Sequence, residues 1–187
     1  MYNNCYNNYY DKFDWLIFND IDEYLYLKNY FNIKDFLIQS KFNNCEKIQL
    51  NWILYTDNNL IFYKNRPLQK RFTEIESIGN NNKYRNIFSN GKSILRGHIG
   101  NINITNFHCL SKNLNSCDGF GNIIKSNFIK FDFKYHYFKH YYCKSLEEFV
   151  EKIKKGDVYK GTINSKLIRY FKYNKITSYK IDYYKKY

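Results

Sequence analysis

Apolar residues recur along the first part of the chain with two different periods. Between residues 2 and 13, aromatic side chains are spaced by three and four positions, which predicts an amphipathic helix with an aromatic face. Residues 15–18 are continuously apolar, and a run of this length predicts a strand buried on both faces, as at the centre of an α/β sheet. Residues 47–55 alternate between polar and apolar, which predicts a half-buried strand. The pattern indicates an α/β fold.

Turn-forming residues divide the chain between these segments and beyond them. Asn32 can cap a short helix over residues 33–37. Residues 57–59 read Asp-Asn-Asn and predict a turn, after which the apolar residues 60–63 return as the second arm of a hairpin. Residues 115–122 contain glycines and other turn formers, so they predict a surface loop.

A helix in the last third of the chain has a clear start signal. Ser145 followed by Glu148 is a capping box, in which the Ser side chain accepts a backbone hydrogen bond and the Glu side chain reaches back. The helix is expected to run over about residues 146–155 and to stop at Gly156. Residues 158–187 form a poorly defined tail, in which Lys and Tyr are mixed with partial helical spacing from Lys166 onward, and the pattern does not place its last dozen residues.

Composition bounds the number of domains and the class of protein. The 187 residues suffice for one domain with its own core, so a single domain over residues 1–187 is expected. Hydrophobic residues make up 44% and aromatic residues 21%, which is too apolar for a disordered chain. The formal net charge of +13 would suit a polyanionic partner. Lys, Asn, Ile, Tyr and Phe are abundant together, however, and we favour codon bias of an AT-rich genome as the source of the charge.

The five cysteines are dispersed and odd in number, and no C-x-x-C pair is present. This spacing indicates neither a zinc knuckle nor a disulfide framework. Free thiols are the default, although Cys109 and Cys117 could pair in an oxidising compartment. The first residues lack the features of a signal peptide, and no apolar stretch is long enough to span a membrane. A soluble protein in the cytoplasm is therefore expected.

Acidic residues directly follow the first apolar run. Asp20 and Asp22 are two positions apart and Glu23 comes next, so a loop after a strand can aim these side chains at one point. Two carboxylates about 4 Å apart repel by roughly 4 kcal/mol at an effective dielectric constant of about 20, so the pair needs a cation or a shared proton. Mg²⁺ or Mn²⁺ bound to carboxylates can also hold phosphate oxygens. The alternative is a solvated turn, which a D-x-D spacing alone does not exclude.

Several segments resemble, in order, the motifs of glycosyltransferase family 92 and related family 2-like enzymes. Residues 14–25 resemble the family pattern DW-apolar-DxDEF-apolar. The other matching segments are Ile48-Gln49-Leu50-Asn51-Trp52, Arg71-Phe72, Lys92-Ser93-Ile94 and His140 to Phe149 with Lys152 and Gly156. Because the matching segments keep their order over roughly residues 5–157, the resemblance is specific.

The resemblance implies a GT-A-type fold, an α/β mixed sheet with flanking helices. It also implies transfer of a sugar from a nucleotide-sugar donor, above all a UDP-sugar, to a glycan or other acceptor. Asp20 and Asp22 would hold a Mn²⁺ or Mg²⁺ ion that binds the donor diphosphate. His140 stands in a motif position that suits a third metal ligand, and Lys144 would face the diphosphate. The equal alternative for His140 is a partly buried histidine among aromatic neighbours.

Other residues are candidates for contacts with the acceptor or for catalysis. Trp52 could stack on a sugar, although a Trp on a strand is more often part of a core. Glu23 is a candidate for contacting the substrate. Asp57 and Glu74 are candidates for a catalytic base, which the motifs do not identify. His108 aligns loosely with a later histidine of the family.

One half of the family fold has no counterpart in the sequence. The βαβ half that binds uracil and ribose would precede residue 2, so the resemblance predicts an N-terminally truncated GT-A fold. Catalysis would then need a separate donor-binding chain or a longer native product, or the chain would be an inactive glycosyltransferase fragment. A further alternative is a basic module whose aromatic residues stack on single-stranded nucleic acid. The carboxylate pair has no role there, so nucleic acid is the weaker candidate partner.

Overall fold

The contacts of the computed structural model divide the chain into two compact units. The structure describes residues 2–75, 91–104, 114–125, 135–155, 167–168, 170–171 and 174–185. The first unit comprises Met1–Ile53 and Gly79–Lys139, and the second comprises Leu54–Ile78 and His140–Tyr187. The expectation of a single domain over the whole chain stays a prediction.

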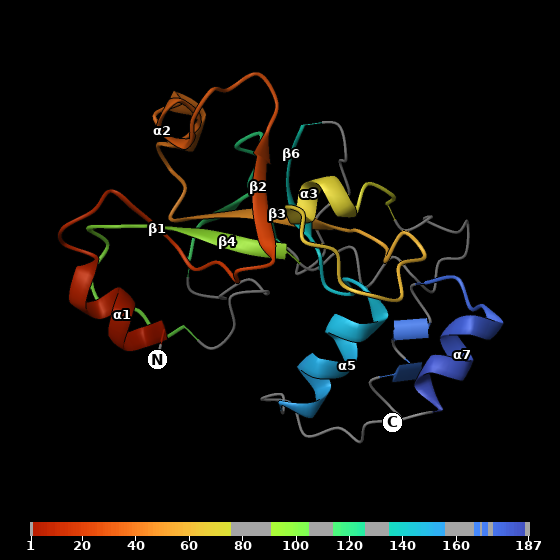
Figure 1. The fold of residues 1–187 in the computed structure, drawn as a ribbon. Coiled ribbons are helices and arrows are strands. Elements are labelled where there is room, and N and C mark those ends of the chain that lie inside the picture. The colour runs from red at the N-terminus through yellow and green to blue at the C-terminus, as the bar shows by residue number, and fades with distance from the viewer. Residues whose placement is uncertain are drawn as a thin grey trace. The chain divides into compact units, whose positions relative to one another are not determined.

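A mixed sheet organises the first unit (Figure 1). The strands are β1 (Trp15–Ile17), β2 (Glu23–Leu27), β3 (Lys47–Leu54), β4 (Gly91–Arg96), β5 (Ser116–Cys117) and β6 (His136–His140). The named helices within the described residues are α1 (Tyr2–Tyr9), α2 (Ile33–Leu37), the 3-10 helix η1 (Ser40–Phe42), α3 (Leu68–Arg71), α5 (Leu146–Lys154) and α7 (Ser178–Tyr184). The strands lie in the order β1-β4-β3-β6-β2, with β5 beside β3. Strand β4 is antiparallel to β1 and β3, whereas β5 is parallel to β3, so the mixed α/β fold class is confirmed.

Consecutive residues of β4 point to opposite faces of the sheet and into two separate cores. Leu95 packs against the buried Tyr6 of α1. The Tyr6 hydroxyl donates a hydrogen bond to the Arg96 carbonyl at 2.6 Å, which fixes α1 to the sheet. The aromatic helix predicted at the start of the chain is therefore confirmed.

The neighbouring residue Ile94 points into the larger core, on the other face. There it shares a cluster of buried side chains with Phe36 of α2 and Phe42 of η1. Asn32 caps α2 as predicted, because its side-chain oxygen accepts from the Asp35 N–H at 3.0 Å. One face of the sheet is thus covered by α1, which the hydrophobic periodicity predicts, and the other by α2, which its capping residue predicts.

Two predictions about strands are corrected by the order of the sheet. The apolar run at residues 15–18 predicts a central strand, but β1 lies at one end of the order of described strands and is half buried. A short apolar run cannot show how many neighbours a strand has. Strand β3 is central and buried along nearly its whole length, polar residues included. Gln49 of β3 is buried, and its side-chain Oε1 accepts a hydrogen bond from Ser93 Oγ at 2.7 Å. A buried polar residue with such a partner produces the same polar–apolar alternation in the sequence as an exposed residue does.

The hairpin predicted after the Asp-Asn-Asn turn is wrong, since residues 60–63 form no strand. The Leu60 carbonyl accepts from the Leu146 N–H at 3.1 Å, and the Ile61 carbonyl accepts from the Glu147 N–H at 2.9 Å. The first N–H groups of a helix have no partner within that helix. The segment therefore supplies hydrogen-bond acceptors to the start of α5.

Two further expectations fail at β5. The sequence predicts a surface loop over residues 115–122, but Ser116 and Cys117 are buried in a strand parallel to β3. The expectation of free thiols is also wrong for Cys117, which forms a disulfide with Cys45 across a Cα–Cα distance of 5.8 Å. The two cysteines are 72 positions apart, and spacing alone does not reveal connectivity. Cys109 lies outside the described residues, and the cytoplasmic location stays a prediction.

The second unit confirms the capping box at the start of α5. Ser145 Oγ accepts from the Glu148 N–H at 3.4 Å, and Glu148 Oε2 accepts from the Ser145 N–H at 3.2 Å. The same carboxylate accepts from Arg71, with Nη1 at 2.7 Å from Oε2 and Nη2 at 3.0 Å from Oε1. Two of the matching sequence motifs are thus joined by one bidentate ion pair. The predicted stop at Gly156 lies outside the described residues.

Replacing Glu148 with Gln is expected to lower the free energy of unfolding by about 2–3 kcal/mol at neutral pH, because the buried Arg71 loses its charged partner. Burial alone would raise the pKa of Glu148, but hydrogen bonds from Arg71 and Ser145 outweigh burial and hold this pKa below its ordinary value of 4.5. The unfolded chain therefore binds the proton more readily. The stabilisation is present above about pH 4.5 and is lost as the pH falls through the folded pKa.

Urea unfolding of the wild type and of Glu148→Gln at neutral pH and at about pH 3 measures this effect. The difference between the two proteins should shrink in acid. Glu151→Gln is the matched control, since Glu151 is an exposed carboxylate on the same helix and its loss should change stability by at most about 0.5 kcal/mol. Equal losses for both variants would contradict the prediction.

Candidate functional site

The acidic residues lie in a turn between β1 and β2 that several hydrogen bonds close. The Glu23 N–H donates to the Asp20 carbonyl at 3.1 Å, and Asn19 Nδ2 donates to the Glu23 carbonyl at 2.7 Å. In the opposite direction, the Asp20 N–H donates to Glu23 Oε2 at 3.2 Å. These hydrogen bonds fix the backbone path of residues 19–23, called the acidic turn below.

Lys92 of β4 places a cation against the acidic turn. Ile17 and Ile94 are opposite each other on the antiparallel strands β1 and β4, so the chain that leaves β1 runs past Lys92. Lys92 Nζ lies 2.9 Å from Asp20 Oδ2 and 3.2 Å from Glu23 Oε2. The ammonium group thereby offsets part of the repulsion between the carboxylates.

Burial determines the protonation of this cluster. The Glu23 side chain is fully buried, and the Lys92 side chain is nearly so. Burial raises the pKa of Glu23 to about 7, although the Lys92 ammonium and the Asp20 N–H oppose the shift. Burial alone would lower the pKa of Lys92, but its hydrogen bond to Asp20 and the charge of Glu23 outweigh burial and raise this pKa. Lys92 is therefore charged at neutral pH.

The two aspartates of the acidic turn differ in exposure. The Asp20 side chain is 54% exposed, Asp22 is buried, and Ile21 between them is exposed to solvent. In the described part of the chain, no group of at least three His, Cys, Asp or Glu side chains could hold a metal ion. Mg²⁺ does not require such a group when substrate phosphates and water complete its shell. Asp20 and Asp22 are the carboxylates of the acidic turn that could take part in such a shell, and Asp20 is the more exposed of the two.

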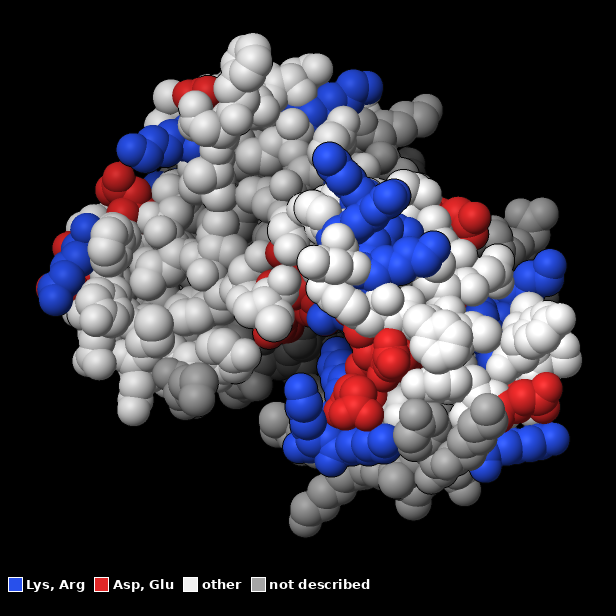
Figure 2. Space-filling model, viewed as in Figure 1, with Lys and Arg blue, Asp and Glu red and all other residues white. Residues whose placement is uncertain are grey.

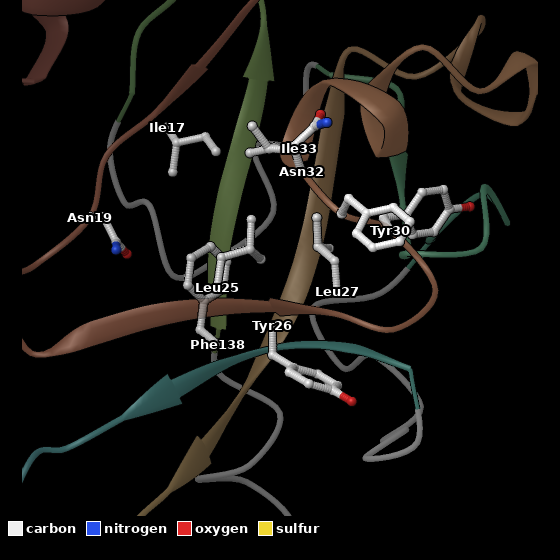
Figure 3. A pocket seen from close by; sticks show the side chains of 10 residues that line it. Ile17, Asn19, Leu25, Tyr26, Leu27, Tyr30, Asn32, Ile33 and Phe138 are labelled. Atoms are coloured by element: carbon white, nitrogen blue, oxygen red, sulfur yellow. The ribbon is translucent and has the colours of Figure 1, made fainter. Parts of the chain in front are cut away.

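A cavity of about 530 Å³ opens beside the acidic turn (Figure 3). Asn19 lines it next to Asp20, while most of the remaining lining is apolar. The apolar residues include Leu25 of β2, Ile33 of α2 and Phe138 of β6. Sequence patterns give no signal for this cavity because its lining comes from separate elements that only the fold brings together.

Trp52, the predicted sugar-stacking residue, is partly buried and packs against the larger core of the first unit. It is not among the residues that line the cavity. Its position agrees with the core alternative, and an acceptor contact at Trp52 stays a prediction. Glu23, the other predicted substrate contact, has its side chain buried within the acidic turn.

His140 and Lys144 belong to the second unit, whereas the acidic turn belongs to the first. His140 is the buried last residue of β6, and its ring meets the Tyr142 ring edge-on at 5.7 Å between centroids. Lys144 has a φ of 53°, which is uncommon for a residue other than glycine. The metal-ligand role of His140 and the diphosphate contact of Lys144 stay predictions.

The two candidate bases lie in the second unit in different surroundings. Asp57 is buried, and its Oδ2 lies 2.5 Å from Lys180 Nζ and accepts from the Tyr170 hydroxyl at 2.5 Å. These contacts favour a structural role, and the role of Asp57 as a base stays a prediction. Glu74 is exposed, and its role as a base stays a prediction. His108 lies outside the described residues.

Comparison with known proteins identifies the class of the chain. A family model described as glycosyltransferase family 92 matches residues 1–183, nearly the whole sequence. The match defines the protein as a glycosyltransferase, with a sugar donor and an acceptor as its substrates. The chain belongs to glycosyltransferase family 92, as its motifs predict. No curated protein matches the chain.

Basic side chains do not form one continuous surface on the face that Figure 2 shows. Lys and Arg occur there in several groups, with Asp and Glu between them. The nucleic-acid alternative stays a prediction. Within the described ranges, no helix is both long enough and apolar enough to cross a membrane.

Proposed function

We propose that the chain transfers a sugar from a nucleotide-sugar donor, above all a UDP-sugar, to a glycan acceptor, with Asp20 and Asp22 holding a Mn²⁺ or Mg²⁺ ion. Membership of family 92 supports the transfer of a sugar. The observation that carries the metal site is the half-exposed carboxylate of Asp20, two positions before the buried Asp22 in the acidic turn.

The residues of the chain have distinct roles in this proposal. A bound divalent ion would hold the donor diphosphate and offset the negative charge of the leaving nucleoside diphosphate. Asp20 and Asp22 would supply the protein oxygens, while phosphate and water complete the shell. Lys144 would contact the diphosphate as a point charge, and its left-handed backbone supports a functional position. His140 is retained as a candidate ligand.

The cavity beside the acidic turn is proposed to receive the acceptor. Its volume of about 530 Å³ lies within the usual range for small-ligand sites. An acceptor bound there would lie next to Asn19, which precedes Asp20 in the acidic turn. Phe31 also lines the cavity and is fully exposed, and the apolar face of a sugar can pack on such a ring.

Replacing Phe31 with Ala is therefore expected to raise the KM for the acceptor by about 3–10-fold, because an aromatic contact contributes roughly 0.5–1.5 kcal/mol. The kcat and the melting temperature should stay unchanged, since the Phe31 ring is fully exposed and loses no burial. Steady-state kinetics at saturating donor measure the change. Phe13→Ala is the matched control, because Phe13 is an exposed aromatic residue that does not line the cavity. An unchanged KM for Phe31→Ala would contradict the acceptor site.

The release of nucleoside diphosphate from UDP-sugars, with a panel of glycan acceptors, tests the proposed function. The protein should be inactive after chelation with EDTA and should regain activity with Mn²⁺ or Mg²⁺. Full activity after chelation would contradict the metal but leave sugar transfer intact. No release from any donor, together with no Mn²⁺-dependent binding of UDP by calorimetry, would contradict transfer by this chain.

A further inference from the structure

We propose that Lys92 is a positioning residue, whose buried ammonium holds the Asp20 carboxylate in the orientation that binds the divalent ion. The inference rests on the proposed metal function of Asp20 and Asp22. Lys92 Nζ contacts Asp20 Oδ2 at 2.9 Å and Glu23 Oε2 at 3.2 Å. An exposed ion pair would fix little, but the buried Glu23 holds the buried Lys92, so the ammonium that contacts Asp20 has a defined position.

Glu23 is the anchor of this arrangement. Its side chain is fully buried, and Oε2 accepts from both Lys92 Nζ and the Asp20 N–H. Asp20 is thereby held at two points, its N–H by Glu23 and its Oδ2 by Lys92. Loss of the hydrogen bond from Lys92 would leave the half-exposed Asp20 side chain less ordered, and binding a metal ion would cost more entropy.

The strands explain how Lys92 reaches the acidic turn. On β4, Lys92 and Ile94 point to the same face of the sheet, because they are two residues apart. The preceding Gly91 lies so close to β3 that an added Cβ would be 1.8 Å from the Leu50 carbonyl oxygen. A residue other than glycine would push β4 away from β3, so the backbone at Lys92 is fixed by strand packing.

If Lys92 orients Asp20, removing Lys92 should weaken metal binding, whereas if its ammonium only repels the ion, removing it should strengthen binding. Water around the half-exposed Asp20 screens part of this repulsion, while the burial of Lys92 limits the screening. Losing a group that orients a metal ligand commonly weakens affinity about 10–100-fold. We therefore expect the loss of orientation to outweigh the loss of repulsion.

The test compares Mn²⁺ affinity, measured by calorimetry without donor, in Lys92→Met and in the double variant Lys92→Met/Glu23→Gln. Lys92→Met leaves the buried Glu23 carboxylate without its cation and should lower the melting temperature, whereas the double variant removes both charges and should regain stability. Both variants should bind Mn²⁺ about tenfold or more weakly. Lys34→Met, at an exposed lysine of α2, should match the wild type. Affinity in the double variant equal to or above that of the wild type would overturn the proposal.

Amide hydrogen exchange provides a second readout that needs no metal. The Asp20 and Glu23 amides close the acidic turn, so their exchange should accelerate in both Lys92 variants. Unchanged exchange in the stable double variant would show that Lys92 does not hold the turn, and would overturn the proposal. If the wild type bound no Mn²⁺, the metal site of the proposed function would fail, while hydrogen exchange would still decide whether Lys92 positions Asp20.

Discussion

Asp20→Asn and Asp22→Asn are each expected to lower kcat/KM for the sugar donor by about 100-fold or more. The amide has the size of the carboxylate but no charge. Each substitution removes one negative charge from the acidic turn, so the turn would hold a divalent ion less tightly. A higher Mn²⁺ concentration should partly restore activity, because the defect lies in metal affinity.

The comparison needs a charge control and a stability control. Asp11→Asn removes an exposed carboxylate outside the acidic turn and should retain full activity. Asp22 is buried, so its variant requires a melting curve to separate loss of the ion from loss of the fold. Folded variants with the activity of the wild type, at limiting Mn²⁺, would refute the metal role of the two aspartates.

The acidic turn shows which part of a site local sequence can predict. Asp20, Asp22 and Glu23 are adjacent in sequence, and the repulsion between carboxylates predicts a nearby cation. The structure supplies one as Lys92, which is far along the chain and reaches the turn through the pairing of β1 with β4. The motif around Lys92 marks a strand, but strand register decides what its side chain touches.

Features that join distant segments are the ones that local patterns miss. The helix caps at Asn32 and Ser145 are confirmed because each needs only residues within a few positions. The Cys45–Cys117 disulfide and the cavity beside the acidic turn depend on chain segments brought together by the sheet. Periodicity carries no information about these contacts.

Lys180, near the end of the chain, is another residue whose contacts with distant segments local sequence patterns do not predict. A lysine in a Lys- and Tyr-rich segment is expected at the surface. In the structure it is fully buried on α7, with Nζ 2.5 Å from Asp57 Oδ2 and 2.8 Å from the Lys175 carbonyl. Asp57 also accepts from Tyr170, and its N–H donates to Asn174 Oδ1 at 2.7 Å. This buried network, which the tail and the Asp57 turn form together, is called the Asp57 network.

Asp57→Ala is expected to lower the free energy of unfolding by about 3–5 kcal/mol, because the Lys180 ammonium is left buried without a counter-charge. Urea unfolding measures the loss. Asp182→Ala is the matched control on α7, since Asp182 is exposed and its removal should change stability by at most about 0.5 kcal/mol. A loss for Asp57→Ala no larger than that of the control would contradict the prediction.

The double variant Asp57→Asn/Lys180→Met separates a structural role of Asp57 from a catalytic one. It removes both buried charges and should recover much of the stability lost in Asp57→Ala, because no unpaired charge remains. If Asp57 is structural, sugar transfer should recover together with stability. If Asp57 is the catalytic base, the stable double variant should still lose about 100-fold or more in kcat. We expect recovery, because the carboxylate already accepts from a buried ammonium and a phenol and is not exposed to an acceptor hydroxyl.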